Sequence, residues 1–161
     1  MKNEIAGAKA LEYLKARHEH VTFAESLTGG LIAATFISNS GASAAIDESY
    51  VTYAPESKMR LLGVCRETVE IDGVVSERCA REMAAGARSR AGADWGVSAT
   101  GLAGPDGGTE RTPVGTVFIG VADKRGAKAV ECHFTGDRMS VRQQTAEMAL
   151  RLLTEALEGA K

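Results

Sequence analysis

Short apolar runs that favour strands alternate with segments of helical periodicity along most of this chain, and this alternation is the pattern of an α/β domain. The helices are expected over 4–18, 29–39, 55–63, 76–90 and 139–157, and the strands over 21–24, 49–54, 93–100, 116–122 and 128–134. The last two strands are separated by DKRG, which predicts an antiparallel hairpin with Gly126 at the turn. We therefore expect a three-layer α/β/α domain with a mixed, mostly parallel sheet and a late antiparallel hairpin.

Apolar spacing also predicts which helix faces are buried. In the first helix Ile5, Leu11 and Leu14 are expected to face inward. The segment 29–39 is apolar enough to be packed on both sides. In the last helix the residues expected to face inward are Val141, Met148, Leu152 and Ala156.

Composition limits the classes of protein that this chain can belong to. Its 161 residues, 44% hydrophobic and 25% charged, fit one globular domain over residues 1–161. A net charge of −2 with dispersed basic residues predicts no nucleic-acid partner. No stretch has the length of a membrane span or the apolar core of a signal peptide, so we expect no membrane contact and a cytoplasmic location. Three widely spaced cysteines predict reduced thiols.

The stretch FAESLTGG places an acid, two hydroxyls and two glycines where a predicted strand becomes a helix. Open α/β sheets bind ligands at the carboxyl ends of their strands. Ser26 lies in the predicted turn, and the amides of Thr28, Gly29 and Gly30 could face an anion with help from the helix dipole. The alternative is an ordinary helix N-cap.

A second candidate position follows the next strand. Tyr53 ends that strand-prone run, and Lys58 stands five residues later in the first turns of a helix. A lysine can act as the base for a serine when burial or neighbours lower its pKa, and Ser–Lys pairs are a known variant of the catalytic triad. The alternative is a solvated surface lysine.

Two further segments carry weaker signals. Thr100 and Gly101 end a buried strand ahead of a glycine-rich run that matches neither a P-loop nor a dinucleotide-binding turn. Arg138 and Arg142 lie four residues apart on the last helix, a spacing that suits either a phosphate clamp or a surface pair with acidic neighbours. The three histidines have no partners for a triad or a metal site, so neither a metal nor a cofactor is expected.

Taken in order, these segments resemble one family, the C-terminal domain of the competence/damage-inducible protein CinA. The resemblance covers about residues 5–157 and is carried by AESLTGG, YAPESKMRLLGV, GVVSERCAREMAAGAR, GADWGVSATGLAGPDGGTERTPVGTVFIGVA and FTGDRMSVRQQTAEMALRLL. The pattern TG-x-AGP-x-GG…PVGTV is the most distinctive part. The chain departs from the family at Leu27, where cysteine is usual, and at YAPESK, where a YSNEAK-like stretch is usual.

The stand-alone form of that domain is the nicotinamide-nucleotide amidohydrolase, so the resemblance implies hydrolysis of nicotinamide mononucleotide (NMN) to nicotinate mononucleotide and ammonia, a step in pyridine-nucleotide salvage. It implies Ser26 as nucleophile, Lys58 as base, and Tyr53 as a residue that orients this pair or holds the ligand. It also implies a homo-oligomer. The substrate-binding residues that it implies are Thr28, Gly29, Gly30, Thr100 and Gly101 around the pocket and Arg138 and Arg142 at the phosphate.

Two questions stay open at this point. Glu25 could anchor the turn or bind ribose hydroxyls as a further substrate-binding residue. The chain could also be a catalytically silent nucleotide-binding or regulatory protein, or an amidase for another small carboxamide. The serine is needed only for the amidases, and the arginines are needed only where a phosphate is bound.

Overall fold

The computed structural model describes residues 4–160 and shows an α/β fold. The strands are β1 (Val21–Glu25), β2 (Tyr50–Val51), β3 (Trp95–Gly101), β4 (Thr116–Asp123) and β5 (Gly126–His133). The α-helices are α1 (Ala8–Arg17), α2 (Leu31–Ile37), α3 (Pro55–Leu62), α4 (Glu77–Ala91) and α5 (Arg138–Gly159). Two short helical turns, η1 (Ala42–Ala44) and η2 (Thr68–Asp72), were not predicted.

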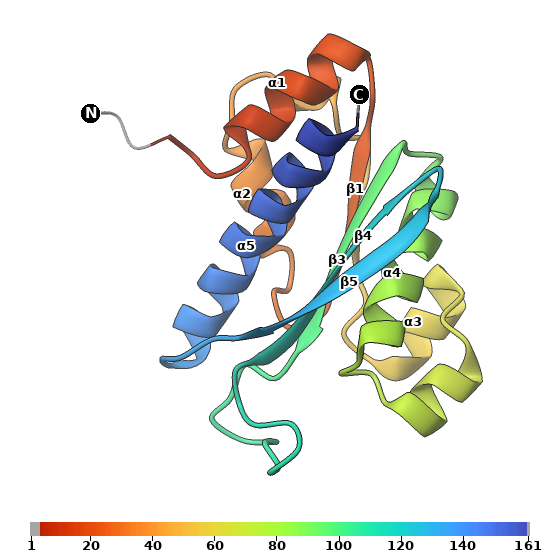
Figure 1. The fold of residues 1–161 in the computed structure, drawn as a ribbon, viewed down its shortest axis with the longest axis vertical. Coiled ribbons are helices and arrows are strands. Elements are labelled where there is room, and N and C mark those ends of the chain that lie inside the picture. The colour runs from red at the N-terminus through yellow and green to blue at the C-terminus, as the bar shows by residue number, and fades with distance from the viewer. Residues whose placement is uncertain (1–3, 161) are drawn as a thin grey trace.

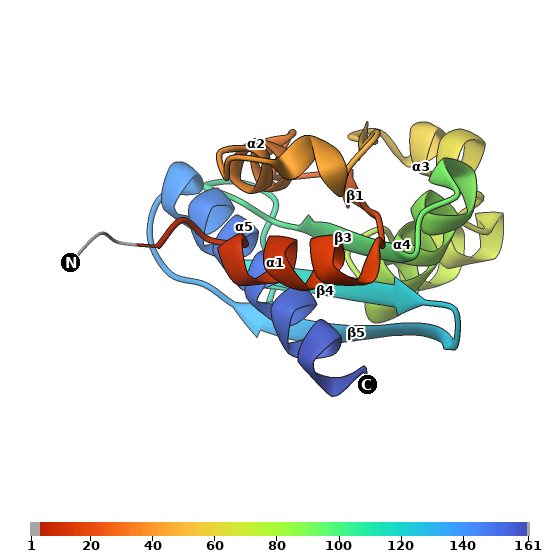
Figure 2. The ribbon, with the colours of Figure 1, turned by 90° about the horizontal axis from the view of Figure 1, so that it is seen from above.

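The five strands form one mixed sheet in the order β2-β1-β3-β4-β5. β1 pairs in parallel with β2 and β3, whereas β4 pairs antiparallel with β3 and β5. Helices α1, α2 and α5 cover one face of the sheet, and α3 and α4 cover the other (Figures 1 and 2). The predicted three-layer arrangement, mixed sheet and late hairpin are confirmed. The sheet is less parallel than expected, with equal numbers of parallel and antiparallel pairings, because no crossover helix separates β3 from β4 and β4 returns antiparallel.

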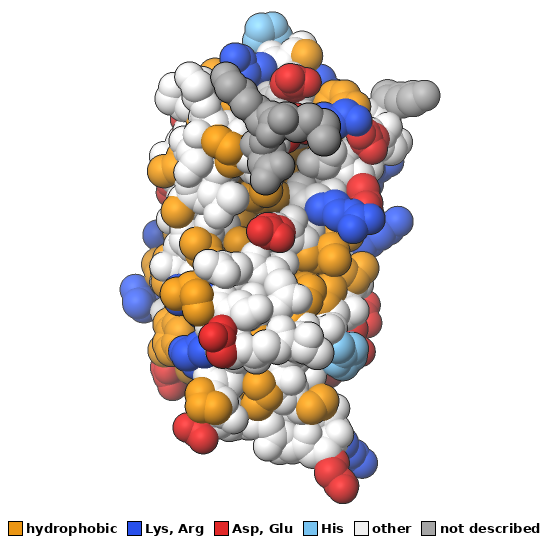
Figure 3. Space-filling view, turned by 90° about the vertical axis from the view of Figure 1, so that its left-hand side faces the viewer, with side chains coloured by type: hydrophobic (Ala, Val, Ile, Leu, Met, Phe, Trp, Pro, Cys, Tyr) orange, Lys and Arg blue, Asp and Glu red, His pale blue; other side chains and the backbone are white. Residues whose placement is uncertain are grey.

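Each face of the sheet has its own apolar core. The larger core lies beneath α1, α2 and α5 and includes Phe23 and Phe36, whose rings meet edge to face with centroids 5.5 Å apart. The smaller core lies beneath α3 and α4 and includes Leu62 and Met83. On the surface drawn in Figure 3, acidic and basic side chains are interspersed, so that surface has no patch of one charge.

Three predictions of buried faces need correction. The first helix begins only at Ala8, after Gly7 with φ 88°, and Ile5 is therefore outside the helix and 46% exposed. α2 buries Ile32 and Phe36 but leaves Ile37 57% exposed, because it lies in the outer layer with sheet on one side only. On α5 the fully buried residues include Leu150, Leu153 and Leu157, whereas the predicted Met148, Leu152 and Ala156 are partly buried at the edge of that core.

The helix that carries Lys58 is held close to α4 by a glycine. A Cβ at Gly86 would collide with the carbonyl oxygen of Leu62, the last residue of α3. We expect Gly86→Ala to lower the free energy of unfolding by about 3 kcal/mol, because the backbones of α3 and α4 would have to separate. Urea unfolding measures this loss. Gly159→Ala is the matched control, because its Cβ would meet nothing within 4 Å; equal losses in both variants would contradict the packing argument.

Candidate active site

Ser26 follows β1 directly, at the carboxyl end of the two parallel pairings in the sheet. Its amide donates to the carbonyl oxygen of Ala99 on β3 at 3.1 Å, which continues the β1–β3 ladder by one step. The chain then turns sharply, since the Gly29 amide donates to the Ser26 carbonyl at 3.1 Å. Gly29 and Gly30 both have positive φ, 59° and 105°, which explains why glycine is required at these positions. The hydroxyl of Ser26 is thus fixed to a strand end by backbone hydrogen bonds.

Lys58 lies on α3, across the sheet from α2, and its side chain reaches the Ser26 hydroxyl (Figure 1). Its Nζ lies 2.9 Å from Ser26 Oγ and also contacts two carbonyl oxygens, that of Thr52 at 2.5 Å and that of Tyr53 at 3.3 Å. Lys58 is 1% exposed and Ser26 is 9% exposed. The structure therefore brings together the two residues that the sequence could only suggest as a pair, 32 positions apart.

Burial lowers the pKa of Lys58 from its usual value of 10.5. A charge on the thiol of Cys79 would oppose this, but burial also raises the pKa of Cys79 to about 11, so this thiol is neutral at pH 7. A neutral amine has two N–H groups and one lone pair. The two carbonyl oxygens can accept the N–H groups, which leaves the lone pair for the Ser26 hydroxyl proton. The surroundings of Lys58 thus suit a base.

The carboxylate of Glu25 binds the beginning of α2. It is fully buried, and its two oxygens accept from the amides of Ile32 at 2.8 Å and Ala33 at 3.1 Å. Of the two roles left open for Glu25, the structure shows the anchor of the turn. The N-terminus of α2 thus binds an anion of the chain itself through amides that lie just after Thr28, Gly29 and Gly30, whose amides were expected to face a ligand anion.

The two hydrogen bonds between Glu25 and the beginning of α2 predict a large effect of this residue on stability. We expect Glu25→Gln to lower the free energy of unfolding by about 3 kcal/mol, because the new amide group turns a donor toward one of two buried N–H groups. Urea unfolding at pH 7 measures the change. The control Glu12→Gln removes an exposed carboxylate from α1. A Glu25→Gln protein as stable as this control would show that the cap contributes little.

Three other predicted site residues, Thr100, Gly101 and Thr28, differ in their surroundings. The Thr100 hydroxyl donates to the carbonyl of Val74 at 2.7 Å, so in this conformation it ties β3 to the segment before α4. Gly101 allows β4 to approach, since a Cβ there would lie 2.6 Å from the Thr116 carbonyl oxygen. The hydroxyl of Thr28 is fully buried, and within the described chain it has no hydrogen-bond partner.

Tyr53 and Arg138 form an exposed contact beside the site. The Tyr53 ring is 63% exposed, and its hydroxyl accepts from Arg138 Nη2 at 3.1 Å, while Nη1 donates to the Gly104 carbonyl at 2.8 Å. It is the backbone carbonyl of Tyr53, not its phenol, that contacts Lys58. Arg138 thereby joins α5, the segment before α3 and the glycine-rich loop after β3.

Arg142 lies one helical turn further along α5 and contacts the Ser26 turn. Its Nε donates to the carbonyl of Leu27 at 2.9 Å and its Nη2 to the carbonyl of Thr28 at 3.1 Å. The two arginines of the predicted phosphate clamp are therefore both bonded to protein oxygens. Sequence reasoning missed these contacts and the Thr52 carbonyl beside Lys58, because a backbone acceptor is present at every position and leaves no mark in the sequence.

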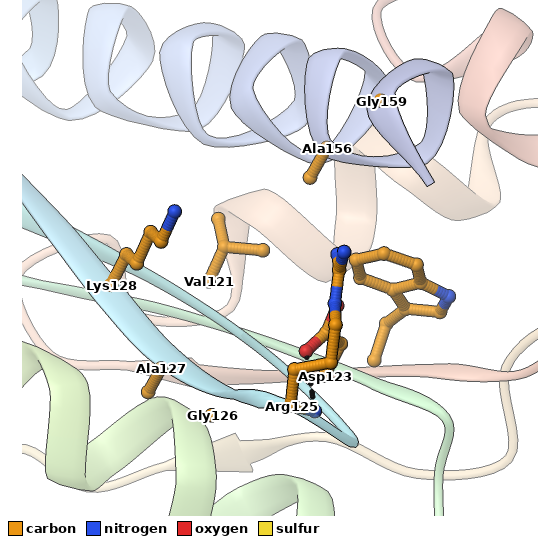
Figure 4. A pocket seen from close by; sticks show the side chains of 9 residues that line it. Val121, Asp123, Arg125, Gly126, Ala127, Lys128, Ala156 and Gly159 are labelled. Atoms are coloured by element: carbon orange, nitrogen blue, oxygen red, sulfur yellow. Dashed lines mark hydrogen bonds and ion pairs between the residues drawn. The ribbon is translucent and has the colours of Figure 1, made fainter. Parts of the chain in front are cut away.

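The hollow drawn in Figure 4 is not part of this site. It has a volume of about 540 Å³, is lined by residues that include Trp95, Val121 and Lys128, and lies at the hairpin end of the sheet, opposite Ser26. Within residues 4–160, no group of three or more His, Cys, Asp or Glu side chains could hold a metal ion. The candidate chemistry of the described chain is thus concentrated at Ser26 and Lys58.

Comparison with known proteins agrees with this fold and these motifs. Residues 3–157 match the CinA C-terminal domain. The chain belongs to this family. A CinA-like protein of Anaeromyxobacter sp. (strain K) is 49% identical over 144 residues, which cover 89% of this chain and 35% of that protein. A putative competence-damage inducible protein of Clostridium perfringens is 47% identical over 138 residues, or 86% of this chain and 34% of that protein. The chain thus spans about a third of these relatives.

Solved structures of the CinA superfamily have the same fold over nearly their whole length. A CinA superfamily protein from Klebsiella pneumoniae superposes with a TM-score of 0.91 at 35% identity, covering 96% of both chains. A competence/damage inducible protein from Agrobacterium tumefaciens superposes with a TM-score of 0.89 at 34% identity, covering 98% of this chain and 99% of that one. As for membranes, α5 is the longest helix described, and neither it nor any other helix of residues 4–160 is apolar enough for a bilayer span.

Proposed function

We propose that this protein is an amidase that converts NMN to nicotinate mononucleotide and ammonia, with Ser26 as nucleophile and Lys58 as base. One observation carries the proposal: the 2.9 Å contact between Ser26 Oγ and the buried Nζ of Lys58. An amide is a poor electrophile, and its hydrolysis gains from a covalent nucleophile activated by an adjacent base. The family resemblance supplies the substrate, because the deamidase form of this domain carries the same ordered motifs.

The proposed acylation uses Lys58 twice. As Ser26 Oγ attacks the carboxamide carbon, its proton passes to the lone pair of Lys58 Nζ, and the carbonyl oxygen becomes an oxyanion. Lys58 then gives this proton to the amide nitrogen, the C–N bond breaks, and ammonia leaves an ester on Ser26. The carbonyl oxygens of Thr52 and Tyr53 hold Nζ in place throughout.

Deacylation repeats these steps with water. Lys58 takes a proton from a water molecule that attacks the ester carbon, and it returns the proton to Ser26 Oγ as the C–O bond breaks. The free serine and a carboxylic acid result, and the acid loses its remaining proton to solvent to give the carboxylate. Ser26 and Lys58 supply the nucleophile and the base without a metal ion in these steps, so the proposed reaction should persist in EDTA.

Substrate recognition is proposed to involve the carboxyl end of the sheet. Arg138 is exposed there, with its guanidinium held by Tyr53 and Gly104, and could donate bidentately to a phosphate. The alternative of another small carboxamide is favoured by the carbonyl contacts of Arg142, which reduce what this side chain can offer to a phosphate.

The test of the proposed function is ammonia release from NMN by the folded protein in EDTA, with nicotinate mononucleotide identified by mass. Nicotinamide is assayed in parallel as a carboxamide without ribose or phosphate. Release from NMN alone supports the proposal. Equal release from nicotinamide would favour the broader amidase, and a folded protein that binds NMN without turnover would establish the silent nucleotide-binding reading.

A further inference from the structure

Arg142 holds the turn that presents Ser26. The side chain is half-buried, and it donates from Nε to the Leu27 carbonyl at 2.9 Å and from Nη2 to the Thr28 carbonyl at 3.1 Å. Its Nη1 lies 3.8 Å from Met139 Sδ. A Cβ on Gly29 would lie 3.4 Å from Nη2, so the turn is also closely fitted to the guanidinium. This bidentate contact fixes two consecutive peptide groups.

The orientation of these carbonyls determines the orientation of the next amides. The peptide bonds of this turn are trans, and in a trans peptide the C=O and N–H groups point in opposite directions. With the Leu27 carbonyl held by Arg142, the Thr28 N–H points away from the guanidinium. In the described chain the Gly29 amide donates to Ser26, whereas the Leu27 and Thr28 amides donate to no protein acceptor. These are the two unpaired donors nearest to Ser26 in the chain.

We infer that Arg142 is a positioning residue for an oxyanion site at the Ser26 turn, where it orients the Thr28 amide beside the neighbouring Leu27 amide, and that it is not a ligand of the substrate phosphate. This inference rests on the proposed function of Ser26 as a nucleophile. Oxyanion donors contribute only when they are aimed in advance at the developing charge, and a rigid turn held by a planar, bidentate guanidinium meets that need. The first amides of α2 cannot replace these donors, because the Leu31 amide donates to the Thr28 carbonyl and the next two bind Glu25.

A fluorophosphonate probe tests the inference without requiring that NMN is the substrate. Ser26 Oγ attacks phosphorus, a P–O bond forms as the P–F bond breaks, fluoride leaves, and the hydroxyl proton passes to Lys58. The phosphoryl oxygen then needs the same oxyanion donors. We expect Arg142→Gln and Arg142→Lys both to slow labelling of Ser26 by about 10²-fold, the usual loss for one oxyanion donor.

The lysine variant separates orientation from charge. Lysine keeps the positive charge but cannot span two carbonyls in a fixed plane. Equal losses in both variants, with an unchanged midpoint in the pH profile of labelling, would exclude an indirect effect through the pKa of Lys58. Arg151→Gln, which removes an exposed arginine from the same helix, should label at the normal rate. Circular dichroism and thermal unfolding confirm that each variant is folded.

Binding of NMN distinguishes positioning from phosphate recognition. In a Ser26→Ala background, Arg142→Gln should leave the Kd for NMN within about threefold, whereas Arg138→Gln should raise it about tenfold or more. In the serine protein, Arg142→Gln should lower kcat with little change in KM. A Kd raised 30-fold by Arg142→Gln, or labelling as fast as in the parent protein, would overturn the inference.

The outcomes also separate this inference from the proposed function. Labelling of Ser26 that depends on Arg142, without release of ammonia from NMN, would support the oxyanion site and reject the substrate. Ammonia release that persists in Arg142→Gln at full kcat would support the amidase and reject the positioning role. A folded parent protein that is neither labelled nor active would overturn both.

Discussion

Replacing Ser26 by alanine is expected to lower the turnover of NMN by at least about 10³-fold while the Kd for NMN stays within about threefold. The hydroxyl is the only group lost, and in the proposed reaction it forms the covalent bond to the substrate. Without it, the remaining donors can still bind ligand and polarise the carbonyl, but no acyl-enzyme can form. Ammonia release measures turnover, and calorimetric titration of NMN measures binding.

Two comparisons make this result specific. Ser38→Ala removes an exposed hydroxyl at the end of α2 and should keep full activity, since its oxygen is bonded to the Ala34 carbonyl outside the site. Lys58→Met added to Ser26→Ala should cause little further loss, because residues that act as one unit are not additive. Full activity of Ser26→Ala would reject the serine mechanism while leaving the amidase possible.

The elements of this fold could largely be predicted from local patterns. Ser76 caps α4 by accepting from the Cys79 amide, Pro55 begins α3, and Gly63 ends it in the left-handed conformation, all at the limits of the helices expected over 55–63 and 76–90. These features depend on neighbours within a few positions. The buried face of each helix is harder to predict, because the burial of a residue such as Ile37 or Leu150 depends on which elements of the fold pack against that helix.

The pair of Ser26 and Lys58 could be named from the sequence only with the help of the family resemblance. A lone lysine in the first turns of a helix is usually solvated, and its burial here follows from the packing of α3 on α4, which directs the Lys58 side chain toward the turn after β1. Its contact with Ser26 is a property of the whole fold. The resemblance to CinA proteins supplied what local spacing could not.

The contacts of Glu25 and Arg142 could not be predicted from the sequence for a related physical reason. A carboxylate or a guanidinium near a predicted site looks available to a ligand when only the sequence is read. In the structure both are bonded to backbone groups, Glu25 to amides of α2 and Arg142 to carbonyls of the Ser26 turn. Backbone partners are independent of residue type, so charged residues that shape a loop resemble those that bind a substrate.

The second large effect is expected from Lys58→Met, which should lower kcat by about 10³-fold, within the range usual for loss of a general base. The unbranched methionine fills similar space but has no lone pair for the serine proton. In the parent protein kcat/KM should rise with pH as Lys58 loses its proton, with a midpoint below 10.5 because burial lowers its pKa. In Lys58→Met the residual rate should lack this rise. Lys128→Met, at an exposed position on β5, is the control and should keep both the parent kcat and the rise of kcat/KM with pH.

The same lowered pKa predicts how stability changes with pH. Between the folded pKa of Lys58 and the unfolded value near 10.5, the unfolded chain binds a proton that the folded chain does not. The contribution of Lys58 to the free energy of unfolding therefore rises with pH across that window, and it is least favourable below the folded pKa, where a charge is buried. Urea unfolding of the parent protein and Lys58→Met at several pH values isolates this contribution. Parallel curves for the two proteins would show that Lys58 titrates normally and is no base.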